Sequence, residues 1–449
     1  MVALGRDAAR TARQGPRPLP VHLTAAVSTW LSSQAALPLL RNGSLAWRPS
    51  LQEAGAALLE SLAKSNPEQV AGAIDLEIRR RFGVLLTGIE RYRHHPYRRD
   101  LADPPEIWRD GTTRLLDYGA AADTPAAHAN GATTDTPGAH ANGATTDAAP
   151  AHANGADAQP LLVVPSLINR AYILDLSGEV SLLRWLAAAG LRPYLVDWDG
   201  PGAQERDFTL TDYIAGRLEA ALDAVLAATG RPPVLVGYCM GGDLALALAQ
   251  RRQRDLDALV LMATPWDFHA GQDAAPLLTG ATWPAIAPLL EVFGEMPVDV
   301  IQALFAGLDP LVAARKFLAF ARFDPDSARA RAFVALEDWL NDGVALARPV
   351  AEECLGGWYS ENTTGKGTWR IAGQAVDPAA VDLPALCMIP DRDRIVPPPS
   401  ALALAEALPS AAIMRPALGH IGMVVSPRAK QAVWQPLLIW LRDRARADQ

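Results

Sequence analysis

Cysteine is scarce in this sequence, which holds Cys239, Cys354 and Cys387 among its 449 residues. Three thiols without a Cys-x-x-Cys spacing provide neither a disulfide framework nor a recognisable metal site, and they suit a reducing cytoplasm. No uninterrupted apolar run reaches the length of about 20 residues that a membrane-spanning helix requires. Residues 1–20 contain arginine and proline but no apolar segment, so we expect no signal peptide.

The sequence also lacks an excess of positive charge. Its formal net charge is −8 and its isoelectric point is about 5.5. This balance argues against general nucleic-acid binding, because nucleic-acid phosphates are held by basic surfaces. Hydrophobic residues make up 50% of the chain, so it can bury a large core. Its length suits two or three ordinary domains, or one large α/β domain with additions.

Large apolar side chains are absent from residues 119–158. The sequence Ala-His-Ala-Asn-Gly-Ala occurs there three times, which places His128, His140 and His152 at intervals of twelve residues. A segment with nothing to bury favours a disordered low-complexity linker, and repeat expansion explains these histidines better than a metal site does. We therefore predict an N-terminal region at residues 1–118, this linker, and a catalytic domain at residues 159–449.

The N-terminal region is predicted to be mostly helical. Residues 1–20 lack periodicity and are predicted to be disordered, whereas apolar residues recur at helical spacing between residues 21 and 92. The basic and aromatic run at residues 91–99 has two interpretations: a solvated helix end that packs on another domain, or a site for an anionic ligand. The adjacent positions of His94 and His95 do not favour a metal pair.

The stretch around Cys239 organises the rest of the chain. Residues 234–236 are branched and apolar, typical of a strand buried on both faces, and residues 243–250 are rich in the helix formers alanine and leucine. Between them lies Gly-x-Cys-x-Gly-Gly, a nucleophile elbow with cysteine in place of serine. The alternative is a structural cysteine beside a glycine-rich turn. The elbow glycines, which let strand and helix pass closely, are Gly237, Gly241 and Gly242.

Strand patterns alternate with helix patterns from residue 160 onward, which predicts an α/β fold with a mostly parallel sheet and helices on both faces. Between residues 269 and 370 the strand pattern stops, and short helical patterns replace it. We expect this insertion to cap the C-terminal edge of the sheet, where the elbow opens. The expected strands are residues 160–165, 193–198, 234–236, 256–263, 385–389 and 412–414.

A cysteine nucleophile needs a base, and the base needs an acid that orients it. After a nucleophile elbow the usual order along the chain is acid and then histidine. Downstream of Cys239 the sequence has His269, at the start of the insertion, and His420, in a loop after the last strand, which is the expected place. Asp391 and Asp393 both follow a buried strand, and their positions alone do not decide between them.

Two backbone N–H groups are expected to stabilise the oxyanion. One belongs to Met240, directly after the nucleophile, and the other to the loop after residue 164, near Ser166 and Leu167. Cys239 itself would lie at a helix N-terminus, where the backbone dipoles favour a thiolate. Because a thiolate exchanges readily with a thioester, acyl-CoA is the natural class of acyl donor.

With these residues in place, the chain resembles the polyhydroxyalkanoate synthases over about residues 105–449. The family's Asp-His-Ile-x-Pro corresponds to residues 393–397, which selects Asp393 over Asp391, although Arg394 stands where the family has histidine. Residues 119–158 are foreign to the family pattern. The other matching segments are the cysteine box at 237–242, residues 160–176 with Asn169 and Tyr172, and residues 195–198, 210–213, 264–268, 337–342 and 419–421.

The resemblance implies an α/β-hydrolase fold with a Cys239–His420–Asp393 triad. It implies polymerisation of 3-hydroxyacyl-CoA into a polyester through a Cys239 thioester, with release of CoA. No metal and no cofactor other than the CoA thioester substrate is expected. The expected partners are 3-hydroxyacyl-CoA, the growing polyester chain, a polymer-granule surface and a second copy of the chain in a homodimer. The expected location is the cytoplasm, on or near the granules.

Two alternatives share these residues. A Cys-dependent hydrolase, either an acyl-CoA thioesterase or a polyester depolymerase, would form the same acyl-Cys239 intermediate and pass it to water. A non-enzymatic protein of the granule surface would have the same fold but would catalyse no reaction. The intact set of Cys239, Asp393 and His420 speaks against that second alternative.

Overall fold

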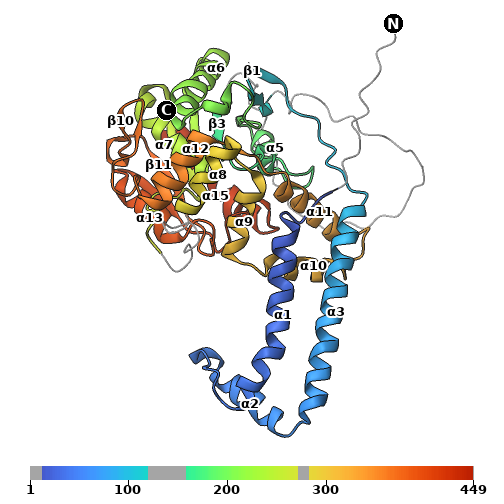
Figure 1. Ribbon diagram of the computed structural model, residues 1–449. Helices are drawn as coiled ribbons and strands as arrows, with labels where there is room; N and C mark the ends of the chain where they lie inside the picture. Colours follow the sequence, from blue (N-terminus) through green and yellow to red (C-terminus); the bar gives the residue numbers. More distant parts are fainter. Residues whose placement is uncertain (1–12, 120–157, 272–282, 448–449) are drawn as a thin grey trace, which may run out of the picture. The chain divides into compact units, whose positions relative to one another are not determined.

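The computed structural model describes residues 13–119, 158–271 and 283–447 (Figure 1). The predicted linker lies outside these residues, apart from its two end positions, and so do its three histidines. Within the part of the chain that the structure describes, no helix is long and apolar enough to cross a membrane.

The chain divides into two compact units. The helical unit consists of Met1–Arg99 and Met296–Ala345, and the sheet unit consists of Asp100–Glu295 and Leu346–Gln449. Much of the predicted cap therefore belongs to the same unit as the N-terminal helices. The predicted domain boundaries and the capping of the sheet edge stay predictions.

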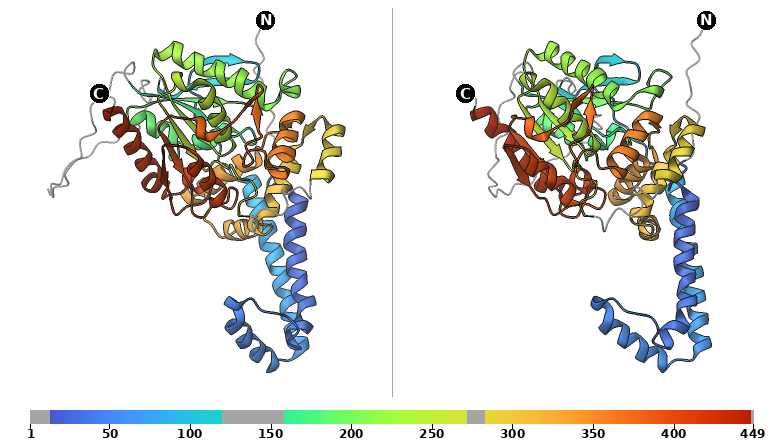
Figure 2. Two further views of the ribbon diagram at one scale, coloured as in Figure 1. Left: turned by 90° about the vertical axis from the view of Figure 1, so that its left-hand side faces the viewer. Right: turned by 60° about the vertical axis from the view of Figure 1, so that its left-hand side comes forward.

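In the helical unit, α1 and α3 run side by side, and α2 lies where the chain passes from α1 to α3 (Figures 1 and 2). The unit's core is strongly aromatic, with Trp30, Tyr92, Phe317 and Phe320 all buried. The elements are α1 (Leu19–Arg41), η1 (Pro49–Leu51), α2 (Gln52–Ala63), α3 (Pro67–His94), α9 (Val298–Leu308), α10 (Val312–Phe320) and α11 (Ala328–Asn341).

The start of the described chain is held by long-range contacts. Arg13 donates a hydrogen bond from Nη2 to Oδ2 of Asp338 at 2.9 Å. It also donates from Nη1 to the carbonyl oxygen of His95. The prediction of disorder is therefore wrong for residues 13–20. Their partners lie far along the chain, so the local pattern that we used could not reveal them.

The basic and aromatic run at residues 91–99 packs within the helical unit. The His95 ring is buried and hydrogen-bonds through Nε2 to the carbonyl oxygen of Pro325 at 2.9 Å, while Arg91 donates to the carbonyl of Ala321 at 2.7 Å. These contacts favour a packed helix end over a ligand site.

The sheet unit is built on eight strands in the order β1-β2-β4-β3-β5-β6-β11-β12. All pairs from β4 to β12 are parallel, and β1 and β2 form an antiparallel hairpin at one edge. The strands are β1 (Glu106–Asp110), β2 (Thr113–Asp117), β3 (Pro160–Val164), β4 (Arg192–Asp197), β5 (Val234–Tyr238), β6 (Ala258–Met262), β11 (Ala385–Met388) and β12 (Ala411–Met414).

The strand order places helices on both faces of the sheet. The chain moves in one direction from β3 to β4 through α5 (Leu182–Ala188), and in the other direction from β4 through α6 (Glu219–Thr229) to β5. It continues that way through α7 (Met240–Arg252) to β6. Because crossovers between parallel strands are right-handed, opposite directions put α5 on one face and both α6 and α7 on the other.

The edge hairpin β1–β2 was not predicted, because residues 1–118 were interpreted as mostly helical. Its turn contains Asp110-Gly111, and Gly111 has a φ of 57°, which glycine adopts without strain. An Asp-Gly pair between short strands is a recognised hairpin signal, so this element was within reach of the sequence.

The remaining elements of the sheet unit are short or surround the sheet. The π-helical segment η8 (Glu352–Ser360) and the loop after β6 matter for the site described below. The others are η2 (Ala171–Leu174), η3 (Glu205–Asp207), η4 (Asp212–Leu218), η5 (Gln253–Asp255), α8 (Trp283–Phe293), β8 (Leu346–Ala347), α12 (Arg348–Ala351), β9 (Arg370–Ile371), β10 (Gln374–Ala375), η9 (Pro378–Ala380), α13 (Pro398–Ala407), α14 (Gly422–Val425), η10 (Lys430–Trp434) and α15 (Gln435–Ala447), with β7 (Glu295–Met296) at the unit boundary.

Candidate active site

Cys239 occupies a sharp, strained turn between β5 and α7. Its φ of 57° and ψ of −132° lie in a region of backbone conformation that residues other than glycine rarely adopt. The turn is held by the Cys239 N–H, which donates to the carbonyl of Met262 at 2.8 Å, and by the Gly242 N–H, which donates to the carbonyl of Cys239 at 2.8 Å. Strain of this kind persists where the surroundings over-determine it, as at a nucleophile elbow.

The three elbow glycines are required by close packing. A Cβ on Gly237 would lie 2.4 Å from the Cα of Gly242, and one on Gly241 would lie 2.1 Å from the carbonyl oxygen of Val164. A Cβ on Gly242 would lie 1.9 Å from Oγ1 of Thr264. The first turn of α7 is thus pressed against the ends of β3, β5 and β6, and this contact fixes where Cys239 points.

His420 and Asp393 meet at the same edge of the sheet. The His420 Nδ1 atom lies 2.7 Å from Oδ2 of Asp393, and both side chains are buried. The other carboxylate oxygen of Asp393 accepts hydrogen bonds from the backbone N–H groups of Ile395 at 2.8 Å and Val396 at 2.9 Å. Two backbone N–H groups and the imidazole thus fix the orientation of the Asp393 carboxyl group.

Cys239 is one of the groups that change the pKa of His420. Burial lowers the pKa of His420, but the charges of Cys239 and Asp393, and hydrogen bonds to both side chains, raise it to about 10. The net direction favours the protonated, imidazolium form of His420. A thiolate paired with an imidazolium is the reactive form of a cysteine nucleophile.

The competing candidates lie elsewhere. Asp391 is exposed on the surface and its Oδ1 accepts a hydrogen bond from Arg415 at 2.8 Å. His269 is hydrogen-bonded through Nε2 to the carbonyl oxygen of Tyr359 at 3.1 Å. The structure therefore brings Asp393, and not Asp391, to the imidazole of His420.

The expected oxyanion donors lie beside the elbow. Met240 is the first residue of α7, so its N–H has no acceptor within the helix. The contact between Gly241 and the carbonyls of Val164 and Pro165 places the start of the loop with Ser166 and Leu167 against the same turn. Within that loop the Ile168 N–H donates to Oγ of Ser166 at 3.1 Å.

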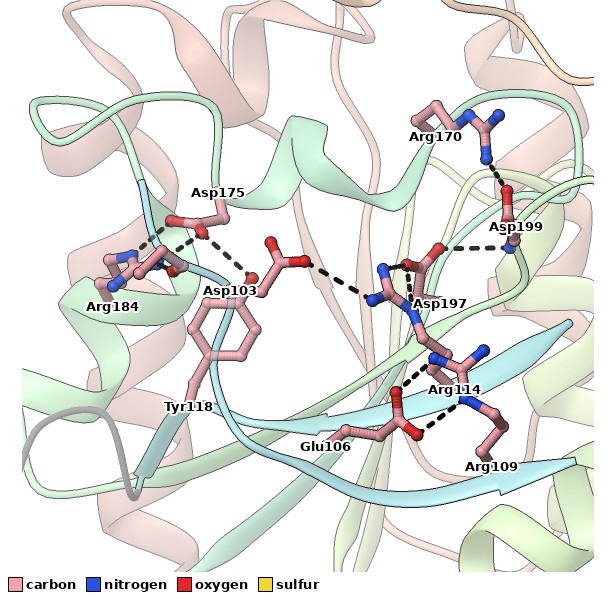
Figure 3. A network of polar contacts seen from close by, with 11 residues as sticks. Asp103, Glu106, Arg109, Arg114, Tyr118, Arg170, Asp175, Arg184, Asp197 and Asp199 are labelled. Atoms are coloured by element: carbon pink, nitrogen blue, oxygen red, sulfur yellow. Dashed lines mark hydrogen bonds and ion pairs between the residues drawn. The ribbon is translucent and has the colours of Figure 1, made fainter. Parts of the chain in front are cut away.

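Ion pairs tie this loop to its neighbours. In Figure 3, Arg170 points at Asp199, which follows β4 and has a φ of 55°, and Arg114 of the hairpin lies between Asp103 and Asp197. The indole N–H of Trp198 also donates to the carbonyl of Pro165 at 3.0 Å. The loops after β3 and β4 thus brace each other. Other members of the network in Figure 3 are Glu106, Arg109, Tyr118, Asp175 and Arg184.

No metal site accompanies these residues. In residues 13–119, 158–271 and 283–447, no three His, Cys, Asp or Glu side chains come together as metal ligands would. Two of the thiols, Cys354 and Cys387, are buried, whereas Cys239 is partly exposed.

Comparison with known proteins identifies the fold and the family of the chain. Residues 159–427 match the family model described as the alpha/beta hydrolase fold. The poly(3-hydroxyalkanoate) polymerase subunit PhaC of Synechocystis sp. is 30% identical over 294 residues, which cover 64% of this chain and 78% of that one. The chain belongs to the poly(3-hydroxyalkanoate) polymerase family of the α/β-hydrolase fold.

Other members of this family are similar over a smaller share of their length. The PhaC subunits of Haloarcula marismortui and Haloferax mediterranei are 28% and 27% identical, over 65% and 64% of this chain. The matched region spans 62% and 59% of those two proteins, which is less than two thirds of their length. Among solved structures, a thermophilic esterase from Thermogutta terrifontis is 19% identical, with a TM-score of 0.41, over 64% of this chain and 90% of that one.

Two neighbours of Cys239 were missed from the sequence. Asp243, four residues on in α7, is fully buried, and neither of its carboxyl oxygens has a hydrogen-bond partner among the described residues. Burial, and then the charge of Cys239, raise the pKa of Asp243 well above its usual value. Burial, and then the charge of Cys239, also raise the pKa of the Tyr359 phenol in η8. An acid inside an otherwise apolar helix was the available signal for Asp243, whereas nothing local marks Tyr359.

Proposed function

We propose that the protein is an acyltransferase that polymerises 3-hydroxyacyl-CoA into a polyhydroxyalkanoate through a thioester on Cys239, with release of CoA. Membership of the polymerase family supports the reaction class. The observation that carries the residue assignment is the His420–Asp393 hydrogen bond of 2.7 Å beside the strained Cys239 elbow. The proposed roles are nucleophile for Cys239, base for His420 and orienting acid for Asp393.

In the first half-reaction, the Cys239 thiolate attacks the thioester carbonyl of the bound 3-hydroxyacyl-CoA. The N–H of Met240 and an N–H of the loop with Ser166 and Leu167 stabilise the oxyanion that forms. The C–S bond to CoA then breaks, and the proton held by His420 passes to the departing sulfur. The products are free CoA and a 3-hydroxyacyl thioester on Cys239.

In the second half-reaction, a 3-hydroxyl group attacks the acyl-Cys239 carbonyl. Neutral His420 takes the hydroxyl proton, an ester bond forms, and the Cys239 thiolate leaves with His420 again protonated. Asp393 keeps the imidazole in the tautomer that both steps need. The two halves together extend the polyester by one unit and restore the starting charges.

The partners follow from the family resemblance. We propose a homodimer that acts in the cytoplasm at the surface of polymer granules, with the growing polyester as its second substrate. No cofactor is needed, because the thioester supplies the energy of the acyl transfer.

The decisive experiment follows three products of 3-hydroxybutyryl-CoA at once: CoA, free 3-hydroxy acid and insoluble polyester. A polymerase gives CoA and polyester, with little free acid, because a 3-hydroxyl group reacts with the acyl-Cys239 thioester faster than water does. If CoA release is matched one for one by free acid, the protein is a thioesterase. Release of acid from added polyester would instead identify a depolymerase.

Two cysteine variants control this experiment. Cys239→Ala should reduce CoA release by at least about a thousandfold, as expected for loss of a nucleophile, while Cys387→Ala should retain most of it. Iodoacetamide should label Cys239 much faster than the two buried thiols. A folded Cys239→Ala protein that keeps a tenth of the rate would exclude the proposed mechanism.

A further inference from the structure

The loop that follows β3 leaves the sheet at the level of the nucleophile. Val164, the last residue of β3, pairs with Gly237 of β5 in parallel register. Two residues further along the two segments come Ser166 and Cys239. We define the oxyanion loop as residues 165–168, because the proposed mechanism takes its second oxyanion donor from this loop.

The N–H groups of the oxyanion loop differ in their hydrogen bonding. Pro165 has no N–H, and the N–H of Ile168 donates to Oγ of Ser166 at 3.1 Å. Within the part of the chain that the structure describes, no acceptor is found for the N–H of Ser166 or for that of Leu167. Backbone N–H groups inside a protein are rarely left without an acceptor, so this position suits a ligand oxygen such as the oxyanion of an acyl transfer.

Trp198 fixes the first peptide group of the oxyanion loop. Its indole N–H donates to the carbonyl oxygen of Pro165 at 3.0 Å, and both residues are buried. The peptide bond between Pro165 and Ser166 is planar and trans, so its N–H points away from its C=O. In the sheet, β3 lies between β4, which leads into Trp198, and β5, which leads into Cys239. A carbonyl that is held on the β4 side therefore directs the Ser166 N–H toward the side of the nucleophile.

The elbow helix confines the same peptide group from another element. A Cβ on Gly241 would lie 2.6 Å from the carbonyl oxygen of Pro165 and 2.7 Å from its carbonyl carbon. Such packing keeps the peptide group in place against the first turn of α7, but it has little directional preference. The hydrogen bond from Trp198 is directional, so it sets the rotation of the peptide plane.

Trp198 is itself held firmly. It is 4% exposed, and its ring meets that of Tyr213 edge to face at 5.6 Å. The next residue, Asp199, has a φ of 55° and forms an ion pair with Arg170, which lies two residues beyond the oxyanion loop (Figure 3). The indole therefore reaches the loop from a fixed position.

We propose that Trp198 is a positioning residue whose indole N–H orients the Pro165–Ser166 peptide, so that the oxyanion loop presents an N–H group to the oxyanion formed at Cys239. The inference rests on the proposed acyl transfer through Cys239. It applies equally to a polymerase and to a hydrolase, because both form this oxyanion.

The expected effect follows from what an oxyanion donor contributes. Removing one such donor lowers kcat by about 10²- to 10³-fold. Loss of the indole N–H misplaces the donor and does not remove it. We therefore expect kcat to fall by about 10- to 100-fold, since a misplacement of about 1 Å can cost about 10²-fold.

The first test is Trp198→Phe, which keeps an aromatic ring beside Tyr213 and removes the N–H donor. In the full-length enzyme, kcat for CoA release from 3-hydroxybutyryl-CoA should fall by at least about tenfold while KM stays within about threefold, because the donor acts in the transition state. Trp185→Phe is the matched control. It removes an indole N–H from α5, where the ring packs on Trp434 at 5.8 Å, and it should leave kcat within about twofold.

A second readout separates the orientation of the loop from a general loss of structure. Iodoacetamide alkylates the Cys239 thiolate at a saturated carbon, where an S–C bond forms, the C–I bond breaks, iodide leaves and no oxyanion appears. The rate of alkylation in Trp198→Phe should therefore stay within about twofold of the original, although CoA release falls. A disturbed elbow would slow both reactions.

A second variant guards against a folding failure in Trp198→Phe. The analogue 3-benzothienylalanine has the shape of tryptophan with sulfur in place of the indole N–H, and it can be incorporated at position 198 during translation. It should reproduce the loss of kcat with little change in melting temperature, because it removes the donor and keeps the packing against Tyr213.

The outcomes separate this inference from the proposed function. If the 3-benzothienylalanine protein keeps kcat within about twofold, or if CoA release and alkylation slow equally in folded Trp198→Phe, Trp198 does not orient the oxyanion loop and the inference is wrong. Free 3-hydroxy acid in place of polyester would overturn the proposed polymerase function, and the same comparison of rates would still decide the inference. If the unmodified protein releases no CoA, both fail.

Discussion

Replacing Asp243 by asparagine removes a group that can ionise while keeping the shape of the side chain. Asp243 is fully buried, its two oxygens have no hydrogen-bond partner among the described residues, and its pKa is raised by burial and by the charge of Cys239. The titratable groups that interact electrostatically with it are Cys239 on the elbow, and Cys354 and Tyr359 on η8. None of these is a cation that could hold a carboxylate.

The sign of the effect follows from proton linkage. In the unfolded chain this carboxyl has a pKa of about 3.9, whereas the native protein keeps it protonated to higher pH. Between those two pKa values the native state binds the extra proton, so rising pH destabilises the native state. The loss is about 1.4 kcal/mol for each pH unit in that window. It disappears below the unfolded pKa.

The assay compares the melting temperatures of the Asp243→Asn variant and the unmodified protein at pH 4, 5, 6 and 7. We expect the melting temperature of the variant, relative to that of the unmodified protein, to rise by on the order of 2 °C for each pH unit above 4, the rate typical of a large domain. The difference between the two melting temperatures should be smallest at pH 4. Asp391→Asn is the control, because Asp391 is exposed and paired with Arg415, and it should gain nothing with pH. If the difference in melting temperature is constant, or shrinks as pH rises, the conclusion that Asp243 is protonated in the native protein is wrong.

Two further predictions concern the elbow and its triad. Asp393→Asn should reduce kcat for CoA release by about 10³- to 10⁴-fold, because the amide would favour the wrong tautomer of His420, whereas Asp391→Asn should stay within about twofold; the reverse ranking would move the acid to Asp391. Gly241→Ala should destabilise the protein by about 1–3 kcal/mol or more, and it should also lower kcat, because its Cβ would lie 2.1 Å from the Val164 carbonyl oxygen beside the oxyanion loop. Gly216→Ala, where a Cβ meets no heavy atom within 4 Å, is the matched control, and equal effects at both glycines would contradict the packing argument.

The parallel sheet and the elbow could be predicted because their signals are local. A buried strand, three glycines and an alanine-rich helix within 17 residues of one another specify Cys239 and its turn. The choice between Asp391 and Asp393 was not local, since both follow β11 in the same loop. It depends on which carboxylate turns toward His420, 27 residues further along the chain.

The surroundings of Cys239 could not be predicted, because they are assembled from distant segments. Tyr359 is fixed by Phe268 and His269 across about 90 residues. The ordered start of the chain depends in the same way on Arg13 and Asp338, which are 325 residues apart. Sequence patterns report which face of an element is apolar, but they do not report which other element covers it.

The charges around Cys239 form a set in which each assignment constrains the next. The Asp393 carboxyl group is held by two backbone N–H groups and faces Nδ1 of His420, and its charge is one cause of the raised pKa of His420. The mechanism that we propose uses Cys239, at the N-terminal end of α7, as a thiolate paired with that imidazolium. A second buried anion one helical turn away would oppose the thiolate, so Asp243 must keep its proton for the pair to form. The neutral state of Asp243 is therefore a condition for the reactive form of Cys239, and Asp243→Asn should leave that form intact.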